Sequence, residues 1–321
     1  MRRRRRRQEE RQGRRLVASR PGVAALGALA GAGAAAAVWG IGIERHLFTV
    51  RHHTVRVLEP GATPLRVLHV SDAHMAPWQR GKQEWMAKLA SLRPDLVVNT
   101  GDNLGHREGL AGIRRAFEPF AGVPGVFVHG SNDLYEPSPR NPLRYVLGPS
   151  ERATTAPKLD TAALDAFFAD ELGWTSLNNA AATLDVRGTA VKLFGVSDAH
   201  HDLDDLDALP AHVAALPSAP VSIGVTHAPY RRVLDAFTEL GADVLIAGHT
   251  HGGQVRVPFY GALVSNCDLP PKQARGLSSW THDGRTVPLN VSAGLGHSIY
   301  SPVRFACPPE VSLLTLAPRA R

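Results

Sequence analysis

Residue types that bind metal ions recur in five short motifs, each directly after an apolar or β-branched run. The motifs are SDAH at 71–74, GDN at 101–103, GSND at 130–133, THAP at 226–229 and GHTHGGQ at 248–254. In an open α/β sheet, ligands bind in the crevice beyond the carboxyl ends of the strands. If each apolar run is a strand, the five motifs meet at one site.

The spacing within the motifs suits metal binding. Side chains two apart on an extended segment point the same way, so Asp72 and His74 would hold one ion. The same reasoning applies to His249 and His251. Mixed carboxylate and imidazole ligands suit Mn, Fe or Zn better than Ca or Mg. An isolated Asp-x-His or Gly-Asp is more often a loop or a turn, but five such motifs in this order predict one shared metal site.

The stretches that carry these motifs alternate between strand and helix patterns. Apolar runs predict strands at 65–70, 95–100, 125–129, 181–184, 190–196, 221–225 and 244–247. Apolar residues at helical spacing predict helices near 85–92, 110–120, 164–172 and 230–240. This alternation indicates βαβ units and an α/β fold class. The segment 134–160 holds five prolines, and we expect a long surface loop there.

The formal net charge of +7 belongs to the N-terminus. Residues 1–20 hold ten Arg and two Glu, a net of +8, which leaves 26 basic and 27 acidic residues and a net of −1 over 21–321. No nucleic-acid partner is therefore expected for the body of the protein. The two cysteines, Cys267 and Cys307, exclude a disulfide-rich scaffold, and their spacing leaves open whether they pair.

Residues 22–43 carry no charge and, as a helix, would be about 33 Å long, enough to cross a bilayer core. We expect a basic cytoplasmic tail at 1–21, a transmembrane or signal-anchor segment at 22–43, an extended linker at 44–63 and one folded domain at 64–318. The positive-inside rule places that domain outside the cytoplasm, on a single-pass protein of the cell membrane. If the segment is instead cleaved as a signal peptide, the domain is secreted.

The order of the five motifs resembles that of the calcineurin-like metallophosphoesterase superfamily. The sequence at 248–254 is similar to its bacterial branch with an N-terminal membrane or export segment, and the resemblance covers roughly residues 64–318. It implies a four-layer α/β/β/α sandwich with a dinuclear metal site at the C-terminal ends of the strands.

The resemblance also assigns ligands to two divalent metal ions, whose identity among Mn, Fe and Zn stays open. Asp72, His74 and His251 would hold the first ion. Asp102 would bridge both ions. His227 and His249 would hold the second ion together with an amide from the third motif.

The third motif departs from the family pattern. Gly-Asn-His-Asp reads here Gly130-Ser131-Asn132-Asp133. Aligned column by column, Ser131 replaces the ligand Asn, and Asn132 replaces the His credited with helping to protonate the leaving group. A shift of one residue would make Asn132 the ligand instead. We favour Asn132, because an amide oxygen binds a metal better than a neutral hydroxyl, and the alternative stays open.

This departure leaves the general acid unassigned. His200 follows the run at 193–196, together with Asp198 and His201, and is one candidate. His297, in the sequence GLGHS at 294–298, is another. The alternative is that each of these histidines is an ordinary loop residue without a catalytic role. The candidate catalytic residues are thus Asp102, Asn132, His200 and His297.

The implied activity is hydrolysis of a phosphodiester or phosphomonoester by a hydroxide activated between two metal ions. The expected partners are a small-molecule or lipid phosphoester, and the membrane through the N-terminal helix. The expected location of the domain outside the cytoplasm favours an envelope or lipid-linked substrate. The alternatives are a broad-specificity nucleotide phosphodiesterase or phosphatase and, from a different class, an inactive metal-binding receptor domain with an altered third motif.

Overall fold

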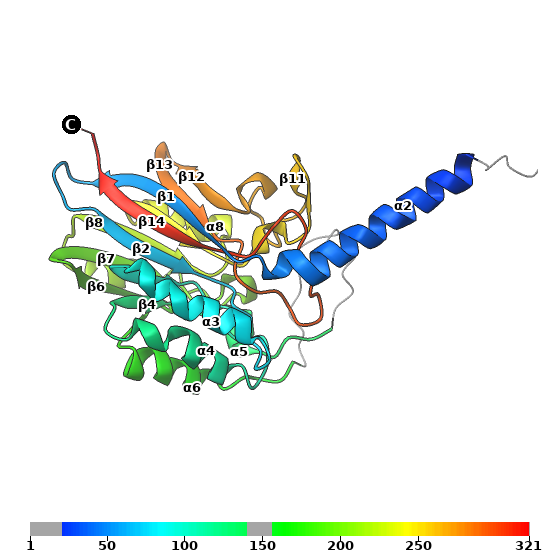
Figure 1. Ribbon diagram of the computed structural model, residues 1–321. Helices are drawn as coiled ribbons and strands as arrows, with labels where there is room; N and C mark the ends of the chain where they lie inside the picture. Colours follow the sequence, from blue (N-terminus) through cyan, green and yellow to red (C-terminus); the bar gives the residue numbers. More distant parts are fainter. Residues whose placement is uncertain (1–20, 140–155, 321) are drawn as a thin grey trace, which may run out of the picture.

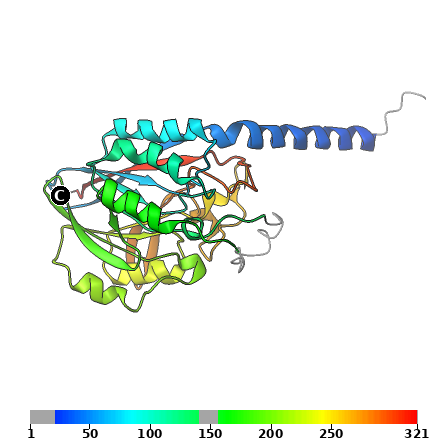
Figure 2. The ribbon, with the colours of Figure 1, turned by 90° about the horizontal axis from the view of Figure 1, so that it is seen from below.

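The computed structural model describes residues 21–139 and 156–320 (Figure 1). Two six-stranded sheets pack face to face, helices cover their outer faces, and one long helix projects from the body (Figure 2). A short hairpin, β10 (Arg256–Val257) and β11 (Gly261–Ala262), lies at the end of the body from which that helix projects.

The first sheet carries the first three motifs. Its strands are β1 (Thr49–Leu58), β2 (Leu65–Val70), β3 (Leu96–Asn99), β4 (Gly125–Phe127), β5 (Thr175–Ser176) and β14 (Glu310–Pro318), in the order β1-β14-β2-β3-β4-β5. Because β2 to β5 run parallel, their carboxyl ends meet at one edge. The outer face is covered by α3 (Arg80–Lys88), α4 (Leu110–Phe117) and α6 (Thr161–Ala166), where Leu68, Phe117 and Phe168 share one apolar core.

The second sheet carries the two histidine motifs. Its strands are β6 (Ala180–Val186), β7 (Thr189–Gly195), β8 (Val221–Thr226), β9 (Val244–Ala247), β12 (Gly276–His282) and β13 (Arg285–Val291), in the order β12-β13-β9-β8-β7-β6. The strands β7, β8 and β9 run parallel. Helices α7 (Leu209–Ala214) and α8 (Arg231–Glu239) cover the outer face, where Leu209, Leu234 and Phe237 form its core.

Alternation along the strands explains why the sheets stack. On β2, Val67 faces the apolar core between the sheets, whereas its neighbour Leu68 faces the outer core under the helices. Ile223 of β8 and Ile246 of β9 fill the inner core from the other side. The four layers and the strand-end position of the motifs confirm the predicted α/β/β/α fold.

Residues 44–63 are largely part of the domain, so the expectation of an extended linker is wrong. Thr49–Leu58 forms β1, which pairs in parallel with β14 at the other end of the chain. Val55 and Val57 of this strand are buried. The strand was missed because its partner is distant in sequence and its central His52 and His53 are polar.

Helix α2 (Pro21–Val38) continues through a π-helical turn at Trp39–Ile43 and a 3₁₀ turn at Glu44–His46. Within the described residues, Ala25–His46 is long and apolar enough to cross a membrane and is almost wholly exposed, although a signal sequence has the same properties. The buried Glu44 carboxylate accepts hydrogen bonds from Trp39 Nε1 (2.6 Å) and from the backbone N–H of Ala306 (3.0 Å), which fixes the base of the helix to the body. Most of the loop expected at 134–160 lies outside the described residues.

Candidate metal centre

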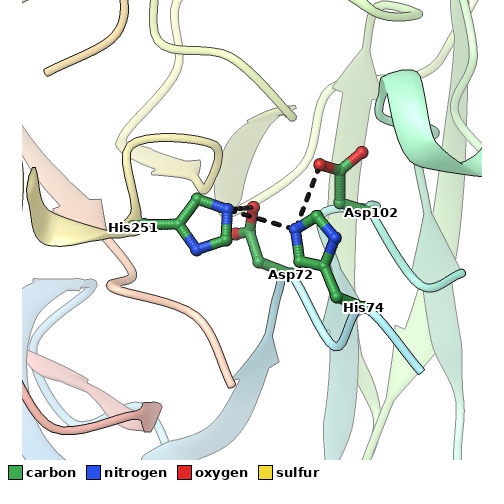
Figure 3. A group of neighbouring side chains, drawn as sticks. All are labelled: Asp72, His74, Asp102 and His251. Carbon is green, nitrogen blue, oxygen red and sulfur yellow. Dashed lines mark hydrogen bonds and ion pairs between the residues drawn. The ribbon is translucent and has the colours of Figure 1, made fainter. Parts of the chain in front are cut away.

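The strand ends of both sheets converge on one buried cluster. The loops after β2 and β3 contribute Asp72, His74 and Asp102, and the loop after β9 contributes His251. One potential ligand atom from each of these four side chains lies within 4.8 Å of the others, and Figure 3 shows the side chains pointing toward one another. The site therefore exists only where the two sheets meet.

Two imidazole nitrogens face each other in the first half of the cluster. His74 Nε2 lies 3.1 Å from His251 Nε2 (Figure 3). Asp72 Oδ1 is 3.5 Å from His251 Nε2, and Asp102 Oδ2 is 3.4 Å from His74 Nε2. These four residues match the first predicted ligand set together with the predicted bridge.

A second facing pair lies on the other side of Asp102. His227, after β8, places Nε2 at 3.3 Å from His249 Nδ1. The same Asp102 Oδ2 is 3.7 Å from His227 Nε2. One carboxylate oxygen thus stands between two imidazole pairs, as a bridge between two ions requires.

The outward-facing ring nitrogens of three of the four imidazoles are held by the backbone. His227 Nδ1 donates to the Thr100 carbonyl (2.7 Å), His249 Nε2 to the Asn266 carbonyl (3.1 Å) and His251 Nδ1 to the Gly296 carbonyl (3.2 Å). A proton on the outer nitrogen leaves the inner nitrogen with its lone pair, the tautomer that a metal ligand needs.

The electrostatics of the half of the cluster that holds His74 and His251 fit a cation. Burial, with a contribution from Arg304, lowers the pKa of His251 to about 3, and burial holds the pKa of His74 well below its usual value, so both rings are neutral. Burial also raises the pKa of Asp102 to about 7. Within the described part of the chain, Asp72 Oδ1 is buried without a hydrogen-bond partner. An orphaned carboxylate oxygen beside neutral inward-facing imidazoles is a donor set suited to a divalent metal ion.

The backbone at the ligands is not extended, which corrects our reasoning from the two-residue spacing. Asp72 (φ 50°), His74 (φ 39°), Asp102 (φ 54°), His249 (φ 67°) and His251 (φ 48°) all adopt the left-handed conformation. Consequently His249 and His251 do not share one position: His251 faces His74, and His249 faces His227. Left-handed non-glycine residues cost about 1–3 kcal/mol each and concentrate at functional sites.

Glycine is required where two loops approach these ligands. A Cβ on Gly130 would collide with the Asp102 carboxylate and the His227 ring, and one on Gly248 would collide with Ser71 and Asp72. The glycines of the third and fifth motifs therefore let the ligand-bearing loops close on one another.

The altered third motif brings Asn132 to the shared carboxylate. Helix α5 (Ser131–Leu134) begins at this motif. The Asn132 backbone N–H donates to Asp102 Oδ1 (2.7 Å), and its Nδ2 donates to Asp102 Oδ2 (2.8 Å). Ser131 Oγ contacts Asn132 Nδ2 at 3.5 Å. The nitrogen and oxygen of an amide exchange places when the group rotates by 180°, so Asn132 can also present its oxygen here.

The two general-acid candidates lie beside different halves of the centre. The His200 ring lies beside the His249 ring, with centroids 4.5 Å apart and a tilt of 45°, and its Nδ1 is 2.9 Å from the Tyr230 hydroxyl. His297 follows Gly296, whose carbonyl holds His251, and its own Nδ1 is 2.9 Å from the Ser298 carbonyl. Both rings are largely buried beside the cluster, and neither is a remote loop residue.

Sequence reasoning gave no role to two residues that hold the ligand loops. The buried Asp133 carboxylate accepts the backbone N–H of Asp102 (2.8 Å), Asn103 (2.7 Å) and Gly130 (3.1 Å). Its place as the last residue of the third motif was the available signal.

The second such residue is Arg304, which is fully buried and donates to the carbonyls of Ala293 (2.7 Å), Gly294 (3.1 Å) and Gly296 (2.6 Å). Its Nη2 also lies 3.5 Å from His251 Nδ1. No motif surrounds Arg304, so the sequence contains no signal for this role.

Comparison with known proteins agrees with this geometry. The family model described as calcineurin-like phosphoesterase matches residues 65–253. The uncharacterized metallophosphoesterase YkuE of Bacillus subtilis (strain 168) is 24% identical over 307 residues, covering 90% of this chain and 94% of YkuE. The uncharacterized protein YpbG of the same organism is 27% identical over 236 residues, covering 73% of this chain and 79% of YpbG.

Among solved structures, the NAD nucleotidase of Haemophilus influenzae aligns with a TM-score of 0.43 and 13% identity, covering 73% of this chain and 51% of that one. The family match includes the first four motifs and the fifth as far as Gly253. The chain therefore belongs to the calcineurin-like phosphoesterase family and is a metallophosphoesterase.

Proposed function

We propose that this metallophosphoesterase hydrolyses a phosphodiester, or less readily a phosphomonoester, at a centre for two divalent ions drawn from Mn, Fe and Zn. The observation that carries the proposal is the position of Asp102 between two facing imidazole pairs. Asp72, His74 and His251 hold one ion, and His227, His249 and Asn132 hold the other. Asp102 is the ligand common to both.

When bound, two such ions supply a nucleophilic hydroxide at neutral pH and neutralise charge on the phosphate oxygens. The protein's part is to keep the ligands in place. Backbone carbonyls orient three of the imidazoles, Asp133 fixes the loop that carries Asp102, and the Asn132 backbone N–H orients the Asp102 carboxylate. His200 and His297 are our candidates to pass a proton to the leaving oxygen. Either ring must first be protonated there, because burial lowers the pKa of His200 to about 2 and that of His297 to about 3.

We further propose that the substrate is an envelope or lipid-linked phosphoester, reached by a domain held outside the cytoplasm. The support is the apolar helix near the N-terminus, preceded by ten arginines. A reporter fused after residue 321 should be active only outside the cytoplasm. Activity of the reporter in the cytoplasm would reverse the topology and remove the argument for an envelope substrate.

The full chain, loaded with Mn²⁺ and assayed with bis-p-nitrophenyl phosphate, tests the activity. We expect turnover that disappears on chelation, together with two metal ions per chain. The matched control is Glu59→Ala, which removes an exposed carboxylate in the turn between β1 and β2. Two bound metal ions without turnover on any phosphoester would favour the metal-binding receptor instead.

A further inference from the structure

The hairpin that follows the metal centre exposes an unusual run of apolar side chains. The segment 255–263, called here the apolar hairpin, includes β10, β11 and the turn between them. Phe259, at the tip, is fully exposed, Tyr260 is 75% exposed, and Val255, Val257 and Leu263 are also exposed. Clusters of exposed apolar side chains on a folded protein mark sites of interaction.

The apolar hairpin is joined to the base of the N-terminal helix. The Arg256 backbone N–H donates to the Phe305 carbonyl (2.9 Å), and Phe305 N–H donates to the Gln254 carbonyl (3.1 Å). One residue earlier, Arg304 N–H donates to the carbonyl of Gly40 at the end of the helix (3.1 Å). A single strand-like segment thus separates the hairpin from the helix base, and Figure 1 shows both at the same end of the body.

The exposed surface of the helix continues onto this end of the body. Trp39, Ile41 and Ile43 are exposed at its base, next to the segment that carries the hairpin. The hairpin itself contains no acidic residue, and its single charged side chain, Arg256, donates to the Gly252 carbonyl (2.9 Å). Tyr is enriched at membrane interfaces, and Phe is among the residues on the apolar face of interfacial segments.

We propose that the apolar hairpin is a second membrane contact, seated in the interface of the same bilayer that the helix spans. The inference rests on the proposed insertion of the N-terminal helix in the membrane. The contact holds the loop of His249 and His251, which directly precedes the hairpin, close to the bilayer surface. The centre is then positioned for a phosphoester carried by a membrane lipid rather than for one free in solution.

The test uses the full chain reconstituted in phosphatidylcholine and phosphatidylglycerol vesicles. Phe259→Cys is labelled with an environment-sensitive NBD fluorophore, and Asp283→Cys, at the exposed β12–β13 turn, is the matched control. Wild-type chain treated with the same reagent measures labelling of the native Cys267 and Cys307. We expect the label at 259 to be blue-shifted and quenched several-fold more strongly by acyl-chain spin labels than the label at 283.

Equal emission and equal quenching at both positions, in protein that resists extraction by alkaline carbonate, would overturn the hairpin contact but not the proposed insertion of the helix in the membrane. Complete extraction by carbonate would overturn the hairpin contact and the insertion of the helix. Shielding from aqueous iodide without quenching by lipid would point to a protein partner and would also overturn the proposal. Tyr260→Cys repeats the measurement one residue away, and turnover of bis-p-nitrophenyl phosphate shows that each labelled chain retains a folded centre.

Discussion

The two halves of the metal centre are built differently, although they share Asp102. The first pair takes His74 from the first sheet and His251 from the second, and Asp72 adds a carboxylate of its own. In the second pair, His227 and His249 both come from the second sheet. The first sheet adds only the amide of Asn132 to this half.

This difference predicts unequal metal affinities. The first half offers two carboxylates, whereas the second offers only the shared one, and ligand charge raises affinity for a divalent cation. The first half also depends directly on the alignment of the two sheets, because its imidazoles come from opposite sides. We therefore expect the second half to lose its metal ion more easily. The metal affinity of the first half should be more sensitive to changes in the packing of the two sheets.

The largest effect is expected where the two halves meet. Asp102→Ala removes the ligand common to both, so activity should fall by at least about 100-fold and metal content should drop, since even outer-shell changes at such sites cost 10–100-fold. Turnover and metal per chain measure the two effects. Full activity with two metal ions still bound would refute the bridging role.

Asn132→Ala tests the second half alone. It should weaken the second metal by about 10–100-fold, and added metal should partly restore the rate. Ser131→Ala, one residue away in the same turn, is the matched control and should do little. If Ser131 is instead the ligand, the pattern reverses: Ser131→Ala loses metal, and Asn132→Ala lowers the rate at full occupancy.

The third test concerns the leaving group. A good leaving group needs no proton, so an enzyme without a general acid should cleave nitrophenyl esters much faster than alkyl esters. If Asn132 occupies the acid position of the motif, Asn132→His should narrow this preference by about tenfold, a part of the roughly 10²–10⁴-fold that general acid catalysis contributes. Equal wild-type rates on both ester types would mean that another residue, His200 or His297, already transfers the proton.

The smallest effect is expected from a buried hydrogen-bond chain between the sheets. His69 Nδ1 lies 2.8 Å from Asn290 Nδ2 of the second sheet, and its Nε2 lies 2.9 Å from Thr100 Oγ1. Thr100 Oγ1 donates to Ser71 Oγ (2.6 Å), which donates to the Asp72 carboxylate. The chain therefore connects the packing of the two sheets to a ligand of the first half.

His69→Phe leaves buried polar partners unsatisfied and should lower the free energy of unfolding by about 1–3 kcal/mol. The exposed strand variant His52→Phe should change it by less than about 0.5 kcal/mol. Denaturant titration measures stability, and metal titration should show a loss of affinity confined to the first ion. An equal loss at both ions would contradict the proposed asymmetry.

The sequence by itself determined the α/β class and most of the ligand types. Short β-branched runs that end in turn residues predict strands, and the polar residues directly after each run then lie at the strand ends. For that reason five local motifs were enough to identify the candidate ligands Asp72, His74, Asp102, His227, His249 and His251.

Only the tertiary structure decided which of these atoms face one another. The pairing of His74 with His251, the place of β1 beside β14, and the burial of Arg304 behind His251 all join residues far apart in the chain. Such contacts depend on how two sheets and their loops pack, and no local spacing encodes them. The contact of Asn132 with Asp102 also depends on the tertiary structure. The Asn132 loop can approach Asp102 only because residue 130 is a glycine, since a Cβ there would collide with the Asp102 carboxylate.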